Sequence, residues 1–207
     1  MEYQRMEGLS IIPGISIASR GAARSVLLLS HKPIEQVQII ALDNSSRSSV
    51  LLLQILLKKF YSRKVSFVSL SPDPEKMLEK ADAALIVGDP ALTFKGDCAE
   101  IYDLGAEWKK FTGLPFVFAF WAGRRNGNLA GYRKVFESSK EFGLSRLDDI
   151  IDQEAAKIPI EPGVLRDYLG VNLDYSLDEE NCRGLRLFYR LAEETGALPR
   201  QRELTFV

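Results

Sequence analysis

The sequence predicts an α/β protein with two lobes. Strands and helices alternate from residue 38 to residue 87, and this alternation is typical of a parallel sheet with crossover helices. After residue 129 the pattern becomes helical, so we expect the C-terminal helices to pack back onto the N-terminal strands. This order of elements predicts two lobes with a cleft between them.

Each element is predicted from its apolar period and from the turn residues at its ends. Strands are expected at 11–18, 25–30, 38–42, 65–70, 83–87 and 115–122. Helices are expected at 48–61, 75–80, 106–111, 129–142, 147–156, 162–169 and 179–195. The run at 115–122 is apolar throughout, which favours a strand buried on both faces at the centre of a sheet. Trp121 is expected in the core, and the alternative is that it lines a ligand cleft.

Composition and charge argue against several classes of function. The 207 residues are 46% hydrophobic, which is typical of a globular protein with a sizeable core. Lys and Arg number 27 against 28 Asp and Glu, a formal net charge of −1, so we expect no nucleic-acid partner. The apolar runs are too short to span a bilayer and residues 1–7 do not resemble a signal peptide. We therefore expect no membrane partner and a cytoplasmic location.

The sequence offers no metal-ligand pattern. Cys98 and Cys182 are far apart and belong to no Cys-x-x-Cys arrangement, so both are expected to be ordinary thiols. His31 is the only histidine, and it is expected to end a strand facing solvent. A Ser-His-Asp mechanism would have to use His31, but the Gly-x-Ser-x-Gly pattern is absent.

The most informative stretch is 41–50, where a strand ends in polar residues and a helix begins. We call this stretch the serine turn, and its candidate substrate-binding residues are Asn44, Ser45, Ser46, Arg47, Ser48 and Ser49. The unpaired N–H groups of a first helical turn, the helix dipole and several hydroxyls together favour a carboxylate or a phosphate. The alternative is that one serine only N-caps the helix.

Two further candidates, Gly88 and Asp89, end the strand at 83–87. Open α/β sheets bind ligands at the carboxyl ends of their parallel strands. We therefore expect Asp89 at the same sheet edge as the serine turn. The alternative is that Asp89 only caps the segment at 90–92.

Five segments together resemble one known family. They read SRGAARSVLL (19–28), LDNSSRSSV (42–50), DAALIVGDPAL (82–92), YDLGAEW (102–108) and TGLPFVFAFWA (112–122). The chain is similar to the chorismate dehydratases of the futalosine route to menaquinone. This resemblance implies a cytoplasmic enzyme with the two-lobed fold of type II periplasmic binding proteins. In that fold, 1–25 and 123–207 would form the first lobe and C-terminal helices, and 26–122 the second α/β lobe with the serine turn.

The resemblance implies an activity as well. The reaction is the loss of water from chorismate to give 3-[(1-carboxyvinyl)oxy]benzoate, with no metal and no organic cofactor. Ser25 carries over from the family pattern as the catalytic, substrate-contacting residue. Chorismate is a dianion, which agrees with hydrogen-bond donors at the serine turn. We hypothesise that the substrate's own enolpyruvyl carboxylate removes the ring proton.

The chain departs from the family pattern at its start. Family members begin with a further lobe-forming segment that carries an active-site asparagine, and Met1 aligns with the interior of the pattern. We therefore expect an incomplete first lobe and poor catalysis by the 207 residues as written. Two alternative functions are a 1,4-dihydroxy-6-naphthoate synthase-like enzyme of the same pathway and a non-catalytic module that binds small anions.

Overall fold

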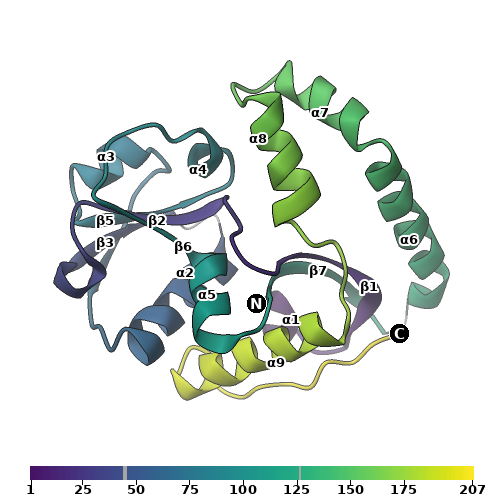
Figure 1. Ribbon diagram of the computed structural model, residues 1–207. Coiled ribbons are helices and arrows are strands. Elements are labelled where there is room, and N and C mark those ends of the chain that lie inside the picture. Colours follow the sequence, from purple (N-terminus) through teal and green to yellow (C-terminus); the bar gives the residue numbers. More distant parts are fainter. Residues whose placement is uncertain (44–45, 126) are drawn as a thin grey trace. The chain divides into compact units, whose positions relative to one another are not determined.

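The chain forms two compact units in a computed structural model that describes residues 1–43, 46–125 and 127–207 (Figure 1). Unit 1 consists of Met1–Arg20 and Leu114–Val207, and unit 2 consists of Gly21–Gly113. The sequence placed the lobe boundaries near residues 25 and 122 instead. The strand near residue 120 explains the difference at the second boundary, because it pairs with the first strand of unit 1.

Unit 2 is built on a five-stranded mixed sheet. The strand order is β4 (Ser66–Ser69), β3 (Ile39–Leu42), β5 (Ala83–Val87), β2 (Val26–Ser30) and β6 (Glu100–Asp103). β3 is parallel to β4 and to β5, as the alternation of strands and helices predicted. β2 is antiparallel to both β5 and β6, a direction on which the sequence analysis made no prediction. The direction of β2 depends on partners far along the chain, which local periodicity does not encode.

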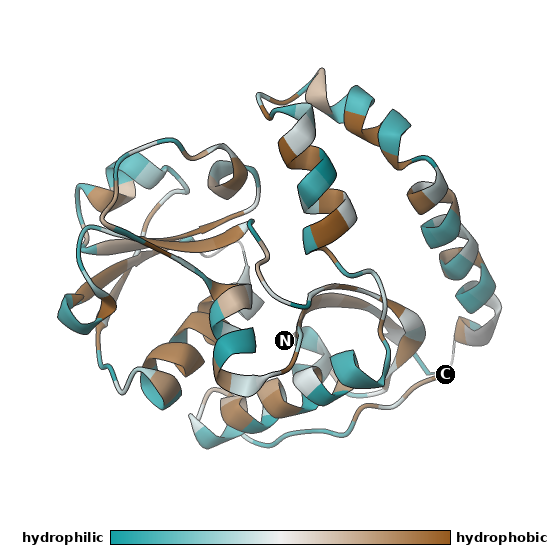
Figure 2. Ribbon diagram, viewed as in Figure 1, coloured by the Kyte–Doolittle hydropathy of each residue, from teal (hydrophilic) through white to brown (hydrophobic). Residues whose placement is uncertain are grey.

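Helices cover both faces of this sheet (Figure 1). On one face, α3 (Pro74–Leu78) and α4 (Asp89–Thr93) bury Met77 and Ala91 against strand residues such as Ile86. On the other face lie α2 (Arg47–Ile55) and α5 (Leu104–Thr112), which includes the fully buried Trp108. A π-helical turn (Leu56–Phe60) continues α2, and a 3₁₀ turn (Ile34–Gln36) precedes β3. Most of α2 is apolar in Figure 2, which agrees with its place against the sheet.

Unit 1 contains a two-stranded antiparallel sheet, β1 (Leu9–Ser19) and β7 (Phe116–Arg124). The helices among the described residues of this unit are α1 (Glu2–Arg5), α6 (Leu129–Ser145), α7 (Leu147–Ala155), α8 (Pro162–Asp167) and α9 (Glu179–Glu194). A π-helical turn (Tyr168–Asn172) continues α8. α9 packs on β7, where the rings of Phe188 and Phe116 lie 4.9 Å apart.

The prediction that 115–122 forms a central, doubly buried strand was wrong. β7 pairs only with β1 among the described strands, and its burial is concentrated at Phe116 and Val117. Trp121 is 53% exposed, so it does not belong to the core. A continuous apolar run does not by itself distinguish a central strand from a strand whose second face borders a pocket.

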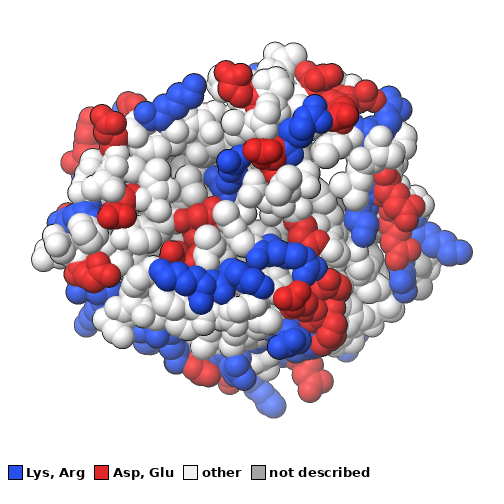
Figure 3. All heavy atoms as spheres, in the orientation of Figure 1, with Lys and Arg blue, Asp and Glu red and all other residues white. Residues whose placement is uncertain are grey.

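The charged side chains of both signs are interspersed over the face shown in Figure 3. No helix among the residues that the structure describes is long and apolar enough to cross a membrane. The absence of nucleic-acid and membrane partners stays a prediction of the sequence.

Gly184 lets α9 approach the backbone that leads into β7. A Cβ atom at Gly184 would lie 2.1 Å from the carbonyl oxygen of Pro115, and that oxygen belongs to the backbone and cannot move cheaply. We expect Gly184→Ala to lower the free energy of unfolding by about 1–3 kcal/mol, as overpacking does. Urea denaturation monitored by circular dichroism measures this change.

Gly163 provides the matched control because a Cβ at this position of α8 meets nothing within 4 Å. Gly163→Ala should be neutral or stabilising by up to about 1 kcal/mol, since alanine favours the helix. Equal losses for the two variants would contradict the close approach at Gly184.

Candidate functional site

Three segments of unit 2 meet at one edge of its sheet. β3 and β5 are parallel neighbours, with Leu42 opposite Leu85, so both strands end at this edge. β2 is antiparallel to β5, with Val26 opposite Val87, so β2 begins where β5 ends. The structure therefore brings the residue before β2, the residues after β3 and the residues after β5 to the same edge.

The serine turn begins helix α2. The Ser46 hydroxyl N-caps this helix by accepting from the backbone N–H of Ser49 at 3.3 Å. The two hydroxyl oxygens of Ser46 and Ser49 lie 2.8 Å apart, and Ser49 is buried. The capping alternative is thus confirmed for Ser46, but capping uses only one of its acceptor positions.

The other predicted residues of the turn differ in exposure. Arg47 is exposed and Ser48 is half-buried, both in the first turn of α2. Asn44 and Ser45 lie outside the described residues. The first N–H groups of a helix have no acceptors within the helix, so this turn presents donors as well as the positive end of the helix dipole.

Ser25 is buried immediately before β2. Its carbonyl oxygen accepts from the backbone N–H of Gly88 at 2.8 Å, which ties the start of β2 to the end of β5. The preceding residue, Arg24, has a φ of 61°, a left-handed conformation that is uncommon for a residue with a side chain. The predicted residues Ser25 and Gly88 are therefore brought together.

Asp103 is a residue of this edge that the sequence reasoning missed. Its carboxylate accepts from the backbone N–H groups of Ala23 at 2.9 Å and Arg24 at 2.6 Å. It also N-caps α5 by accepting from Gly105 and Ala106. One carboxylate thus holds the turn before Ser25 against the start of α5. The Asp-Leu-Gly order at 103–105 is a detectable capping signal, but it does not reveal the distant turn.

Gly88 and Asp89 end β5 as predicted. Gly88 has a φ of 78°, where a glycine avoids the penalty that a Cβ would bring. Gly88 is the N-cap of α4 and Asp89 is its first residue, so the alternative that Asp89 caps this segment was wrong. The side chain of Asp89 is exposed, while Asp43, which follows β3, is a buried acid that the sequence reasoning did not select.

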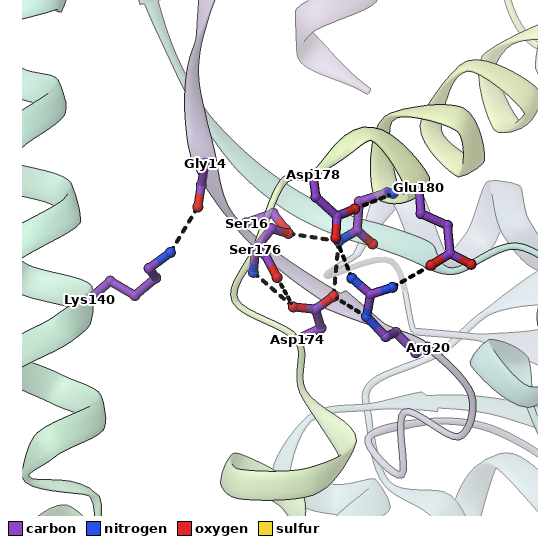
Figure 4. Close-up of polar contacts among 9 residues, drawn as sticks. Gly14, Ser16, Arg20, Lys140, Asp174, Ser176, Asp178 and Glu180 are labelled. Carbon is purple, nitrogen blue, oxygen red and sulfur yellow. Dashed lines mark hydrogen bonds and ion pairs between the residues drawn. The ribbon is translucent and has the colours of Figure 1, made fainter.

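A separate polar cluster in unit 1 centres on Arg20 (Figure 4). Its guanidinium reaches Asp174 at 2.8 Å, Asp178 at 2.6 Å and Glu180 at 2.5 Å, which joins the residue after β1 to the start of α9. Burial alone would raise the pKa of Asp174, but hydrogen bonds from Asn181 and Ser176 and the charge of Arg20 lower it overall. The backbone N–H of Asn181 and then Arg20 lower the pKa of Asp178.

The Arg20 cluster should make stability depend on pH. The pKa values of Asp174 and Asp178 are lower in the folded state than in the unfolded state. The two carboxylates therefore stabilise the fold above the unfolded-state pKa of about 3.9, and this stabilisation is lost as the pH falls through the folded-state pKa values. Arg20→Gln should lower the free energy of unfolding at pH 6. Between pH 6 and pH 3 this variant should then lose less free energy of unfolding than the unmodified protein. Urea denaturation at both pH values measures this.

Arg5→Gln is the matched control, since the one ion pair of Arg5 with a described residue is a 4.0 Å contact with the exposed Glu2. Its pH dependence should equal that of the unmodified protein. An unchanged pH dependence in Arg20→Gln would show that Arg20 does not set the two pKa values.

The histidine and the cysteines lie where the sequence placed them. His31 is exposed after β2, and its Nε2 lies 3.2 Å from the carbonyl oxygen of Leu78. Cys98 and Cys182 are free thiols. Within the described parts of the chain, no three His, Cys, Asp or Glu side chains gather as metal ligands. Chemistry without a metal or cofactor stays a prediction.

Comparison with known proteins gives the family and the fold. The family described as "Menaquinone biosynthesis" matches residues 1–194. A chorismate dehydratase from Thermus thermophilus is 31% identical over 201 residues, which cover 89% of this chain and 74% of that protein.

Two solved structures have a similar fold over nearly the whole of this chain. An ABC transporter protein from Parabacteroides distasonis has a TM-score of 0.63 at 15% identity and matches 99% of this chain and 75% of that chain. The periplasmic aliphatic sulphonate binding protein from Escherichia coli has a TM-score of 0.60 at 16% identity and matches 99% and 72%. These likenesses confirm the predicted α/β fold of the periplasmic-binding-protein type.

Asp103 offers a direct test of how the candidate edge is held together. Asp103→Ala removes the N-cap of α5 and the acceptor for Ala23 and Arg24, so we expect a loss of about 0.5–2 kcal/mol or more in the free energy of unfolding. Asp73→Ala is the control because, among the described residues, the carboxylate of Asp73 contacts only its own helix, where it caps α3 and pairs with Lys76 at 2.6 Å. An equal loss in the control would argue against the anchoring of the turn by Asp103.

Proposed function

The chain belongs to the menaquinone biosynthesis family, and from that premise we propose that it is a lyase that dehydrates chorismate to 3-[(1-carboxyvinyl)oxy]benzoate. The observation that carries the proposal is the 31% identity to a chorismate dehydratase along most of the chain. Neither this relative nor the family favours the 1,4-dihydroxy-6-naphthoate synthase or the non-catalytic anion-binding module. A cytoplasmic location stays a prediction of the sequence resemblance.

We propose that the serine turn is the binding site of one substrate carboxylate. Ser46 and Ser49 have one hydroxyl hydrogen each. One of these two hydrogens forms the hydrogen bond between the two hydroxyl oxygens. Because Ser49 is the buried member, the pair is best used when Ser49 donates to Ser46 and Ser46 donates to the ligand. A charge-assisted bond from Ser46 then adds to the N–H groups of the α2 N-terminus.

The remaining residues of the edge are proposed to orient the ring. Ser25 lies at the start of β2 and contacts the substrate in this proposal, as the family pattern implies. Asp89 carries a negative charge, so it repels a carboxylate of the substrate. It favours instead a hydroxyl group of the substrate, which can donate a hydrogen bond to it. A dianion would therefore bind with a carboxylate at the serine turn and its neutral hydroxyl toward Asp89.

The proposed reaction removes one ring proton and the ring hydroxyl as water, and the ring becomes aromatic. Aromatisation supplies a large driving force, so orientation of the substrate is the main task of the residues at the edge. We propose that the enolpyruvyl carboxylate of the substrate takes the ring proton. The exposed His31 lies after the other end of β2, so it is not assigned a part in the reaction.

Measurement of chorismate binding tests whether the serine turn binds the carboxylate. The double variant Ser46→Ala, Ser49→Ala loses a donor to a charged ligand, a cost of about 1.5–3 kcal/mol, so the Kd in calorimetry should rise about tenfold or more. Ser66→Ala is the matched control, because Ser66 is exposed at the start of β4, at the opposite edge of the sheet. If the double variant binds chorismate as tightly as the unmodified protein does, the role of these serines is helix capping alone.

Conversion tests the reaction itself. The protein is incubated with chorismate, and 3-[(1-carboxyvinyl)oxy]benzoate is measured by chromatography, with the Thermus thermophilus relative as positive control. Product formation that falls in the double serine variant supports the proposal. Binding without product would contradict the lyase assignment and favour the anion-binding module.

A further inference from the structure

Asp103 joins two distant segments of unit 2 through one carboxylate, at the end of β6 and the N-cap of α5. Its Oδ1 accepts from the backbone N–H groups of Gly105 and Ala106, at 2.9 and 3.0 Å, and from that of Ala23 at 2.9 Å. Its Oδ2 accepts from the backbone N–H of Arg24 at 2.6 Å. Of these four bonds, those to Oδ1 include the helix cap, whereas the bond to Oδ2 serves only the turn before β2.

The turn before β2 adopts a backbone conformation that needs support from its surroundings. Arg24 has a φ of 61°, and a residue with a Cβ keeps such a left-handed conformation only where other contacts hold it. The hydrogen bond from its N–H to Asp103 is a contact of this kind. The next residue, Ser25, is also held by its carbonyl oxygen, which accepts from the N–H of Gly88 at 2.8 Å. The backbone is therefore fixed on both sides of Ser25.

The register of the sheet explains why the Asp103 carboxylate reaches this turn. β6 is antiparallel to β2, with Asp103 opposite Leu27, so β6 ends where β2 begins. Ser25 lies two residues before Leu27, and its side chain is buried. Burial limits the rotamers that a side chain can adopt, so the direction of the Ser25 hydroxyl follows the backbone of the turn.

We infer that Asp103 is a positioning residue for the proposed dehydration. It does not contact the substrate in this role. Its carboxylate holds the turn at Ala23 and Arg24, so that the Ser25 hydroxyl meets the substrate in one orientation. A displacement of about 1 Å in a substrate-contacting group costs up to about 100-fold in rate. Because Ser25 is assigned from the family pattern, this role rests on the proposed function.

The negative charge of Asp103 acts on a dianion in the opposite direction to this positioning role. A carboxylate at the candidate edge repels the carboxylates of the substrate, so removal of its charge alone should strengthen binding. Loss of positioning should weaken binding instead, because the Ser25 hydroxyl loses its fixed orientation. The sign of the change in affinity therefore separates the two effects.

Asp103→Asn is the informative variant, because asparagine has nearly the same size but only one acceptor oxygen. Asparagine is a good N-cap, so we expect its oxygen to stay at α5 and the midpoint of urea denaturation to stay close to that of the unmodified protein. The amide NH2 group then faces the N–H of Arg24, and two donors cannot form a bond. NMR should show faster hydrogen exchange at the Arg24 amide and unchanged exchange at Gly105 and Ala106.

A double-mutant cycle with chorismate, measured by calorimetry, tests whether Asp103 acts through Ser25. Asp103→Asn should raise the Kd about tenfold, as the loss of one well-directed contact does. In the Ser25→Ala background the same substitution should change the Kd by less than about twofold, because the hydroxyl that it positions is absent.

Asp73→Asn is the matched control for the loss of charge. Asp73 is the N-cap of α3 and follows β4, which is parallel to β3 and ends at the same edge of the sheet. The substitution removes a carboxylate charge there without a change in the turn before Ser25. It should leave the Kd for chorismate within about twofold of that of the unmodified protein.

Two results would overturn the inference while the proposed function stands. Equal or tighter chorismate binding by Asp103→Asn would show that this carboxylate only repels the substrate. An equal rise in Kd with and without the Ser25 hydroxyl would show that Asp103 does not act through Ser25. If the unmodified protein neither binds nor converts chorismate, the proposed function itself fails, and the role of Asp103 is then that of a structural cap.

Discussion

The antiparallel pairing of β2 with β5 is the constraint on which the candidate site of unit 2 depends. It places Ser25 beside Gly88, and the parallel pairing of β3 with β5 places the serine turn at the same edge. If β2 ran parallel to β5, Ser25 would lie a whole strand away, about 16 Å at 3.3 Å per residue. Asp103 completes the arrangement because it holds the turn before Ser25 to the start of α5.

The sequence predicted most of this edge for reasons that are local. The polar run after β3 and the glycine after β5 each end a strand, and α2 begins at the serine turn. The direction of β2 and the anchoring by Asp103 depend on contacts between residues far apart in the chain. Periodicity and capping patterns carry no information about such contacts, so sequence reasoning did not find them.

The failure at β7 has a different physical cause. A continuous apolar run indicates contact with apolar surroundings on both faces, and for Phe116 and Val117 this is correct. At Trp121 the second face borders a pocket rather than packed side chains. Hydrophobicity alone does not separate these cases, since a ligand-binding wall and a packed core are built from the same residue types.

The candidate site of unit 2 is proposed to recognise an anion through donors whose directions are fixed. The serine turn offers neutral donors whose directions are fixed by a capped helix, and such donors favour one orientation of a ligand that carries several oxygens. In this proposal the exposed Asp89 makes the site more selective. A negative charge near fixed donors disfavours misplaced carboxylates, because it repels any carboxylate that binds away from the donors.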